Sequence, residues 1–300
     1  MSSDLRALIR LGRLPFVLGG FCLFAYGNLV AGLAGASPAA AELLLGCLVL
    51  AAGQLSVSYS NDYYDRRADA LGERTRISGG SGILVDRPDL APAARRIALG
   101  LIALSLLLAL CFSLIYPVPW YFLPFVLTGN LMGWYYTGPP LSLAYRGLGE
   151  AATMLTFGFF MPGMGYLVAA GHLDLFFFTA SFPLLFLGLA FIVTVELPDM
   201  EADRAAGKRN FVAASGRTAA YRVAFLGCAA ASVLFFLAGS VHPVFWTVSF
   251  LSLVPLAVTA VHLRASRPDR DGAVPAAERA MAGLVACILL ADLTLVLSLT

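Results

Sequence analysis

The sequence predicts an all-α, polytopic membrane protein with nine transmembrane helices, arranged as two four-helix halves plus one helix around a central cavity. Three observations point to this fold class: 59% of the 300 residues are hydrophobic, only 13% are charged, and the apolar residues form long runs. Soluble domains carry about 25% charged residues. A chain this apolar cannot hide its surface in one soluble core, so the bilayer must be its solvent.

The first predicted span follows a basic N-terminal segment. Arg6, Arg10 and Arg13 precede an apolar run from Leu14 towards Leu33, and no A-x-A-like cleavage site follows a short apolar region. This pattern favours a retained transmembrane helix over a secretory signal peptide. Because about 20 apolar residues cross the hydrocarbon core, the successive runs predict nine spans. They are residues 14–34, 40–60, 94–115, 119–137, 149–170, 175–197, 218–239, 243–263 and 278–299.

The breaks between these spans differ in length. Those at residues 116–119 and 240–243 are the shortest, and both contain proline. Proline ends a helix because it lacks a backbone N–H and clashes with the preceding turn. The remaining breaks are longer, and several carry charge.

The distribution of basic residues predicts the orientation of the chain. All 20 Lys and Arg residues fall in segments that nine spans place on one side: the N-terminal segment and loops 61–96, 138–148, 198–222 and 264–279. The opposite loops contain none. By the positive-inside rule, the N-terminus is cytoplasmic and the C-terminus lies outside, in a membrane of the bacterial inner-membrane type. No nucleic-acid partner and no obligatory protein partner are predicted.

A first acidic segment ends the second predicted span. Asn61, Asp65 and Asp69 are spaced i, i+4 and i+8, so they share one face of a helix. Asp62 points elsewhere on an ideal helix. Carboxylates at the end of a membrane helix are costly unless they pair, bind a metal ion or face water.

A second acidic segment ends the sixth span, four spans later. Asp199 and Asp203 repeat the i, i+4 spacing, and Glu196 lies one turn earlier on nearly the same face. Mg²⁺ prefers a few carboxylate oxygens together with water and phosphate. The two segments therefore predict a Mg²⁺ site that holds a diphosphate, with Asn61, Asp65, Asp69, Glu196, Asp199 and Asp203 as ligands. The alternative is a set of solvated helix-end charges.

Basic residues follow both acidic segments. Arg66, Arg74, Lys208 and Arg209 are predicted to bind diphosphate oxygens, although the positive-inside bias explains cytoplasmic basic residues without any ligand. The glycine-rich stretch 78–82 is either part of a lid over the site or a flexible linker.

Polar and aromatic residues inside the spans predict the wall of a substrate cavity. The candidates are Tyr135, Tyr136, Asn130 and Gln54. The alternatives are an interfacial aromatic belt for the tyrosines and helix–helix hydrogen bonds for the two amides. Asp292, an acid within the ninth span, receives no role.

These motifs resemble those of a known family. Residues 61–69 are similar to the first NDxxDxxxD motif of the UbiA superfamily of intramembrane prenyltransferases, and residues 199–207 are similar to its second DxxxD motif. Residues 61–65, 136–140 and 147–150 resemble the menaquinone branch, the 1,4-dihydroxy-2-naphthoate prenyltransferases. The chain departs from that branch at Glu196 and Pro198, where Asn and Arg are frequent.

The resemblance implies Mg²⁺-dependent transfer of a prenyl group from a polyprenyl diphosphate to a small aromatic, quinone-precursor-like acceptor, with release of diphosphate. Asp65, Asp69, Asp199 and Asp203 would be the catalytic residues that hold Mg²⁺ and the head group. The substrate would reach the site laterally from the lipid. Residues 1–300 would form a single integral-membrane domain, with loops 61–96 and 198–222 as the cap of the active site.

Two other functions are compatible with the sequence. A terpene cyclase of the UbiA type needs the same metal and the same allylic cation but no aromatic acceptor. A membrane transporter that uses intramembrane carboxylates is less consistent, because transport predicts acids near the bilayer midplane, and here they gather at the cytoplasmic end.

Overall fold

The computed structural model describes residues 3–265 and 269–300, and this part of the chain contains helices and no strand. The α-helices are α1 (Ser3–Leu11), α2 (Leu14–Leu33), α3 (Ala40–Asp69), α4 (Ile83–Asp86), α5 (Ala91–Ile115), α6 (Phe122–Thr137), α7 (Gly149–Leu155), α8 (Met161–Ala170), α9 (Leu175–Glu196), α10 (Met200–Ala205), α11 (Phe211–Ser215), α12 (Arg217–Ala238), α13 (Val244–Ala265) and α14 (Arg270–Leu299). A π-helical turn, Thr156–Phe160, joins α7 to α8. The predicted all-α class is confirmed.

Within the described residues, eight helical segments are long and apolar enough to cross a membrane. Each overlaps one of the predicted spans. The span predicted at 119–137 corresponds to α6, which has only 16 residues and is shorter than the other eight. The total of nine spans and their division into two halves stay predictions.

Two helices extend beyond their predicted ends. Helix α3 has 30 residues and continues to Asp69, so the first acidic segment forms its last turns rather than a loop. Helix α14 begins at Arg270, where the Asp269 side chain accepts a hydrogen bond from the Gly272 N–H and caps the helix. In both cases the helix continues past its apolar stretch because polar residues there find partners inside the protein.

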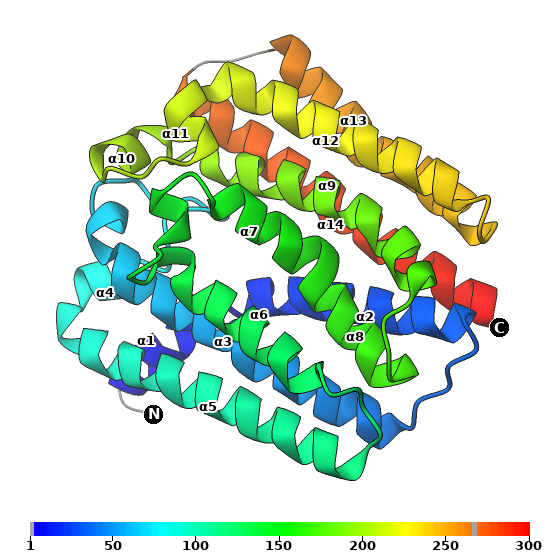
Figure 1. The fold of residues 1–300 in the computed structure, drawn as a ribbon. Coiled ribbons are helices and arrows are strands. Elements are labelled where there is room, and N and C mark those ends of the chain that lie inside the picture. Colours follow the sequence, from blue (N-terminus) through cyan, green and yellow to red (C-terminus); the bar gives the residue numbers. More distant parts are fainter. Residues whose placement is uncertain (1–2, 266–268) are drawn as a thin grey trace.

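The long helices lie side by side in one bundle, and the short helices α4, α10 and α11 gather at one end (Figure 1). The two chain ends lie at opposite ends of the bundle (Figure 1). Helix α3 packs on α5, α2 on α8, and α12 on both α9 and α13. This arrangement brings the ends of α3 and α9, which carry the two acidic segments, to the end where the short helices lie.

Helices α2 and α8 cross with their backbones in contact. A Cβ atom added at Gly27 would overlap the carbonyl oxygen of Pro162, and one added at Gly165 would overlap that of Phe24. Small residues allow this close approach, which is a common way for membrane helices to pack. Tyr26 adds a hydrogen bond of 2.8 Å from its hydroxyl to the Ala180 carbonyl oxygen of α9.

The close contact of α2 and α8 predicts that one added methyl group destabilises the protein. We expect Gly27→Ala to lower the free energy of unfolding by about 1–3 kcal/mol, because α2 and α8 must move apart. Gly100→Ala is the matched control, since no atom lies near its added Cβ. Thermal unfolding in detergent measures both. Equal melting temperatures for the two variants would contradict the packing described for α2 and α8.

Candidate active site

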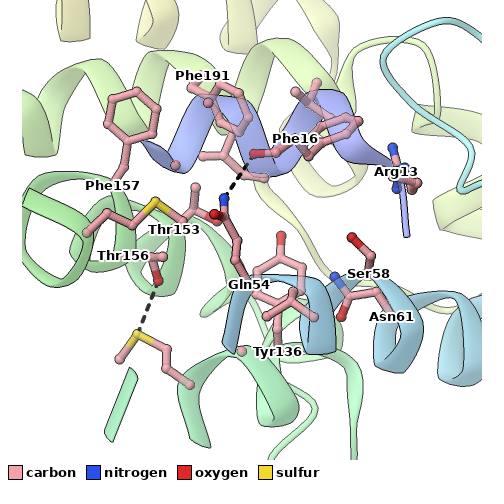
Figure 2. Close-up of a pocket in the computed structure, with 18 of the residues that line it drawn as sticks. Arg13, Phe16, Gln54, Ser58, Asn61, Tyr136, Thr153, Thr156, Phe157 and Phe191 are labelled. Atoms are coloured by element: carbon pink, nitrogen blue, oxygen red, sulfur yellow. Dashed lines mark hydrogen bonds between the residues drawn. The ribbon is translucent and has the colours of Figure 1, made fainter. Parts of the chain in front are cut away.

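A cavity of about 590 Å³ lies within the bundle. Its lining follows α3 from Asp69 to Val49, which corresponds to about 30 Å at 1.5 Å per residue. Most of the wall is apolar and comes from α2, α6, the π-helical turn, α9 and α14. In the part shown in Figure 2, Phe157 and Phe191 lie on one side, with Arg13, Ser58 and Asn61 on the other.

Both acidic segments contribute to the wall of this cavity. Six carboxylates line it: Asp62, Asp65 and Asp69 from the end of α3, Glu196 from the end of α9, and Asp199 and Asp203 from the start of α10. Four of the six belong to buried residues, among them Asp62, which is 3% exposed. Since buried charges must be compensated, the neighbours of each carboxylate decide what the site can do.

Lys208 lies between the two acidic segments. Its Nζ atom is 2.9 Å from Asp65 Oδ2 and 3.3 Å from Asp203 Oδ1, and its side chain is 13% exposed. Burial alone would lower the pKa of Lys208, but the two carboxylates outweigh burial and raise the pKa well above its ordinary value. Lys208 is therefore a protonated ammonium that joins α3 to the segment around α10.

The second oxygen of each of these carboxylates also has a donor. The Tyr145 hydroxyl donates to Asp65 Oδ1 at 2.8 Å, and Asn210 Nδ2 donates to Asp203 Oδ2 at 2.6 Å. Both carboxylates are thus oriented by neutral groups as well as by Lys208.

The glycine-rich stretch 78–82 supplies donors to two further carboxylates. Ser78 Oγ and Gly79 N donate to the Asp199 carboxylate, each at 3.0 Å. Ser81 N donates to Asp62 Oδ2 at 3.0 Å, and the Ser81 hydroxyl binds the same oxygen. Burial, followed by the nearby Asp203 carboxylate, raises the pKa of Asp199 to about 6 in spite of these donors.

The glycines of this stretch are required by its path. Gly79, Gly80 and Gly82 have φ angles of 82°, 64° and 69°, in the left-handed region where residues with a Cβ atom are strained. A Cβ atom added at Gly80 would overlap the Asp69 carboxylate. The backbone of residues 78–82, called the lid below, therefore lies directly against the acids.

Arginine side chains hold the second acidic segment in place. Arg217, whose side chain is 2% exposed, donates from Nε to the Leu197 carbonyl oxygen at 2.9 Å and from both Nη atoms to Glu201. Arg270 donates to the Pro198 carbonyl oxygen at 3.2 Å and to Glu73. Through Arg270, the loop after α3 and the start of α10 are fixed relative to α14.

Comparison with known proteins agrees with this geometry. Residues 14–284 match the model of the UbiA prenyltransferase family. The chain belongs to this family. No match is found among curated proteins.

Solved structures of UbiA homologues share the fold of this UbiA family member. A homologue from Archaeoglobus fulgidus, bound to GPP and Mg²⁺, has a TM-score of 0.66 at 18% identity, over 95% of this chain and 99% of that one. A digeranylgeranylglyceryl phosphate synthase has a TM-score of 0.65 at 15% identity, over 98% and 99%. The apo homologue from Aeropyrum pernix K1 has a TM-score of 0.64 at 16% identity, over 95% and 98%.

The donor set of this UbiA family member suits a divalent metal ion. Carboxylate oxygens are the ligands that Mg²⁺ prefers, and Glu196 Oε2 is buried without a hydrogen-bond partner in the described part of the chain. As the side chains lie, residues 3–265 and 269–300 contain no group of three His, Cys, Asp or Glu side chains that is placed to hold a metal ion. Lys208 and the donors of the lid engage four of the six carboxylates.

Only one of the four residues predicted to bind diphosphate lines the cavity, and it is Lys208. Arg74 lies outside the lining and donates to both Asp86 oxygens at 3.0 Å and to the Gly82 carbonyl oxygen at 2.9 Å. Arg66 lies over the Tyr63 ring, and Arg209 is exposed. For these three arginines the diphosphate role stays a prediction, and in this structure Arg74 fixes the lid.

Three of the four predicted wall residues do line the cavity: Tyr136, Asn130 and Gln54, whereas Tyr135 does not. Asn130 Nδ2 donates to Ser105 Oγ of α5 at 3.1 Å. Gln54 Nε2 donates to the Phe16 carbonyl oxygen of α2 at 2.9 Å (Figure 2). Both amides therefore connect neighbouring helices while they face the cavity.

Several lining residues were not predicted as site residues. The prediction that Asp62 points away is wrong, because the lid covers that face of α3 and Ser81 binds the carboxylate. Arg13 and Arg76 also line the cavity. Arg13 has a φ of 48°, a left-handed conformation that is strained for arginine and separates α1 from α2. In the sequence, Arg13 directly precedes the first apolar run and Arg76 follows the first acidic segment, and these positions could have indicated that both residues lie near the site.

The contacts of Arg217 predict a loss of stability on its replacement. We expect Arg217→Met to lower the free energy of unfolding by about 2–3 kcal/mol, because it removes charge-assisted hydrogen bonds from a buried position. Glu201→Gln should cost less, since the Glu201 side chain is 56% exposed and the bond to Leu197 is kept. Thermal unfolding compares the two variants, and an equal loss would contradict this ranking.

Proposed function

We propose that this protein is an intramembrane prenyltransferase that moves a prenyl group from a polyprenyl diphosphate to a small aromatic acceptor and releases diphosphate. The observation that carries the proposal is the convergence of six carboxylates in the wall of a largely apolar cavity. A charged diphosphate with a long apolar tail has the same division of polarity. Membership of the UbiA family supports the same reaction class.

Mg²⁺ is the proposed cofactor, held by Asp65, Asp69, Asp199 and Asp203 with Asn61 and Glu196. When bound, it would neutralise the diphosphate and make it a better leaving group. The chain itself positions the carboxylates through Tyr145, Asn210 and the lid. Lys208 is the predicted diphosphate-binding residue that lines the cavity, and its ammonium would contact diphosphate oxygens.

The apolar part of the cavity is proposed to hold the prenyl tail and to keep water from an allylic cation. Phe157, Phe160 and Phe191 supply aromatic faces to this wall, and such faces stabilise positive charge. A groove along α14 shares Arg76, Ile77, Met281 and Val285 with the cavity. This shared boundary supports lateral access of the substrate from the lipid.

The acceptor is proposed to be an aromatic compound of the kind used in quinone biosynthesis, as in the 1,4-dihydroxy-2-naphthoate branch. The polar side of the cavity, with Arg13, Ser58 and Asn61, offers hydrogen-bonding groups beyond the carboxylates (Figure 2). These groups favour a second, polar substrate over the alternative of a terpene cyclase, which binds only the diphosphate.

The proposed membrane topology has nine spans, with α6 as the shortest. The N-terminus and the acidic end of the cavity would be cytoplasmic, the C-terminus would lie outside, and loops 61–96 and 198–222 would cap the site. The chain ends at opposite ends of the bundle support an odd number of crossings (Figure 1).

The proposed reaction predicts metal-dependent release of diphosphate. Purified protein in lipid nanodiscs is mixed with Mg²⁺ and prenyl diphosphates of several lengths, with and without 1,4-dihydroxy-2-naphthoate. We expect release to stop in EDTA and to fall by about 100-fold or more in Asp65→Ala and Asp199→Ala, because each loses part of the charge that holds the leaving group. Mass spectrometry of the products distinguishes a prenylated ring from a cyclised hydrocarbon.

Asp89→Asn is the control for these variants, since Asp89 is an exposed, ion-paired carboxylate outside the cavity. Diphosphate release that survives both alanine substitutions would refute the assignment of the site. A cyclised product formed equally well without the acceptor would replace the transferase by the cyclase.

The contact between the lid and Asp69 predicts a second effect on activity. We expect Gly80→Ala to lower the rate of diphosphate release by about 10-fold or more, because its methyl group displaces the Asp69 carboxylate. Gly207→Ala is a matched control: Gly207 also has a positive φ, of 78°, but no atom lies near its added Cβ. If both variants lose the same activity, backbone strain and not the displaced carboxylate is the cause.

A further inference from the structure

Lys208 is the only lysine among the 300 residues, and every other basic side chain is arginine. The positive-inside rule does not require a lysine at this position, because arginine satisfies the rule equally well. The single ammonium lies between Asp65 and Asp203, at 2.9 Å and 3.3 Å. Among the described residues, the ion pairs that join the two acidic segments are both made by this lysine.

The charge around Lys208 is far from balanced. Of the six carboxylates that line the cavity, only Asp65 and Asp203 form an ion pair in the described part of the chain, and both pair with Lys208. Glu196 Oε2 has no hydrogen-bond partner among the described residues. The cavity wall thus holds six carboxyl groups and three basic side chains, those of Lys208, Arg13 and Arg76.

The carboxylates bound by Lys208 do not depend on it for their orientation. Tyr145 and Asn210 donate to their second oxygens, at 2.8 Å and 2.6 Å. The backbone of Lys208 is held by a bond of 2.9 Å from its N–H to the Asp203 carbonyl oxygen. The four-carbon side chain can therefore swing from a fixed point and leave two preformed carboxylates behind.

We propose that Lys208 is an exchangeable internal cation: it joins the two acidic segments in the metal-free protein and gives up Asp65 and Asp203 when a divalent metal ion binds. The released ammonium then faces the incoming diphosphate. The inference rests on the proposed metal and diphosphate site. Arginine would not serve, because its rigid fork binds a carboxylate in two places and leaves less readily.

Because the chain has a single lysine, the reactivity of the Lys208 amine can be measured directly in the unaltered protein. Acylation of the Lys208 amine by an amine-reactive reagent is followed by mass spectrometry, with the α-amino group of the chain as internal reference. We expect Lys208 to react slowly in EDTA and about tenfold faster in Mg²⁺, because an amine on a flexible side chain that is released from two carboxylates is open to the reagent. Inorganic diphosphate added with Mg²⁺ should protect Lys208 again.

Two substitutions give a readout that is independent of acylation. Lys208→Met should lower the melting temperature in EDTA by about 5–10 °C and bind Mn²⁺, followed by electron paramagnetic resonance, about tenfold more tightly. Lys208→Arg should keep the melting temperature and bind Mn²⁺ more weakly than the unaltered protein. Arg222→Met, at an exposed position of α12 outside the cavity lining, is the control and should change neither quantity.

Three results would overturn the proposal. They are an unchanged or lower reactivity of Lys208 in Mg²⁺, a Mn²⁺ affinity of Lys208→Met equal to or weaker than that of the unaltered protein, and no protection by diphosphate. If Lys208→Met does not fold without metal, the acylation measurement still decides. Because neither measurement uses a prenyl substrate, exchange can succeed when prenyl transfer fails, and the two outcomes are distinguished.

Discussion

The burial of many carboxylates at one end of a membrane-embedded cavity is the constraint on which the rest of this structure depends. Ionised groups removed from water are costly unless hydrogen bonds and opposite charges compensate them. Here the compensation comes mainly from loop segments: residues 78–82, Tyr145, Lys208 and Asn210. The loops at this end of the bundle are therefore shaped by the acids, and the glycine conformations of the lid follow from the need to bring backbone N–H groups close to them.

The second acidic segment has Pro198 at a position where arginine is frequent in the menaquinone branch, and the surrounding contacts supply support for its backbone. Pro198 carries no side-chain donor, yet its carbonyl oxygen accepts a bond from Arg270, while Arg217 fixes the neighbouring Leu197. Positive charge from distant helices thus supports the backbone of the second acidic segment. Glu196, in turn, keeps an acid at the buried end of α9, where one oxygen has no donor within the described residues.

The sequence predicted the helical class, the long spans and both acidic segments, because hydrophobic runs and i, i+4 spacing depend on local order along the chain. It did not predict which basic residues face the cavity. Arg74 and Lys208 follow their acidic segments in a similar way, but a bond to Asp86 draws Arg74 away while Asp65 draws Lys208 inward. Contacts between residues far apart in sequence decided these positions. Asp62 was misjudged because an ideal helix has one buried face, whereas the end of α3 is covered on more than one side.

The π-helical turn at Thr156–Phe160 links two properties that are usually separate. Each residue of an α-helix turns the chain by about 100°, so the wide turn sets the phase of α8 relative to α7. With that phase, α7 packs on α9 while Gly165 of α8 faces α2. Phe157 and Phe160 of the same turn line the cavity. Loss of one residue here would rotate Gly165 away from α2, so the aromatic side chains of the turn cannot change register unless the bundle is repacked as well.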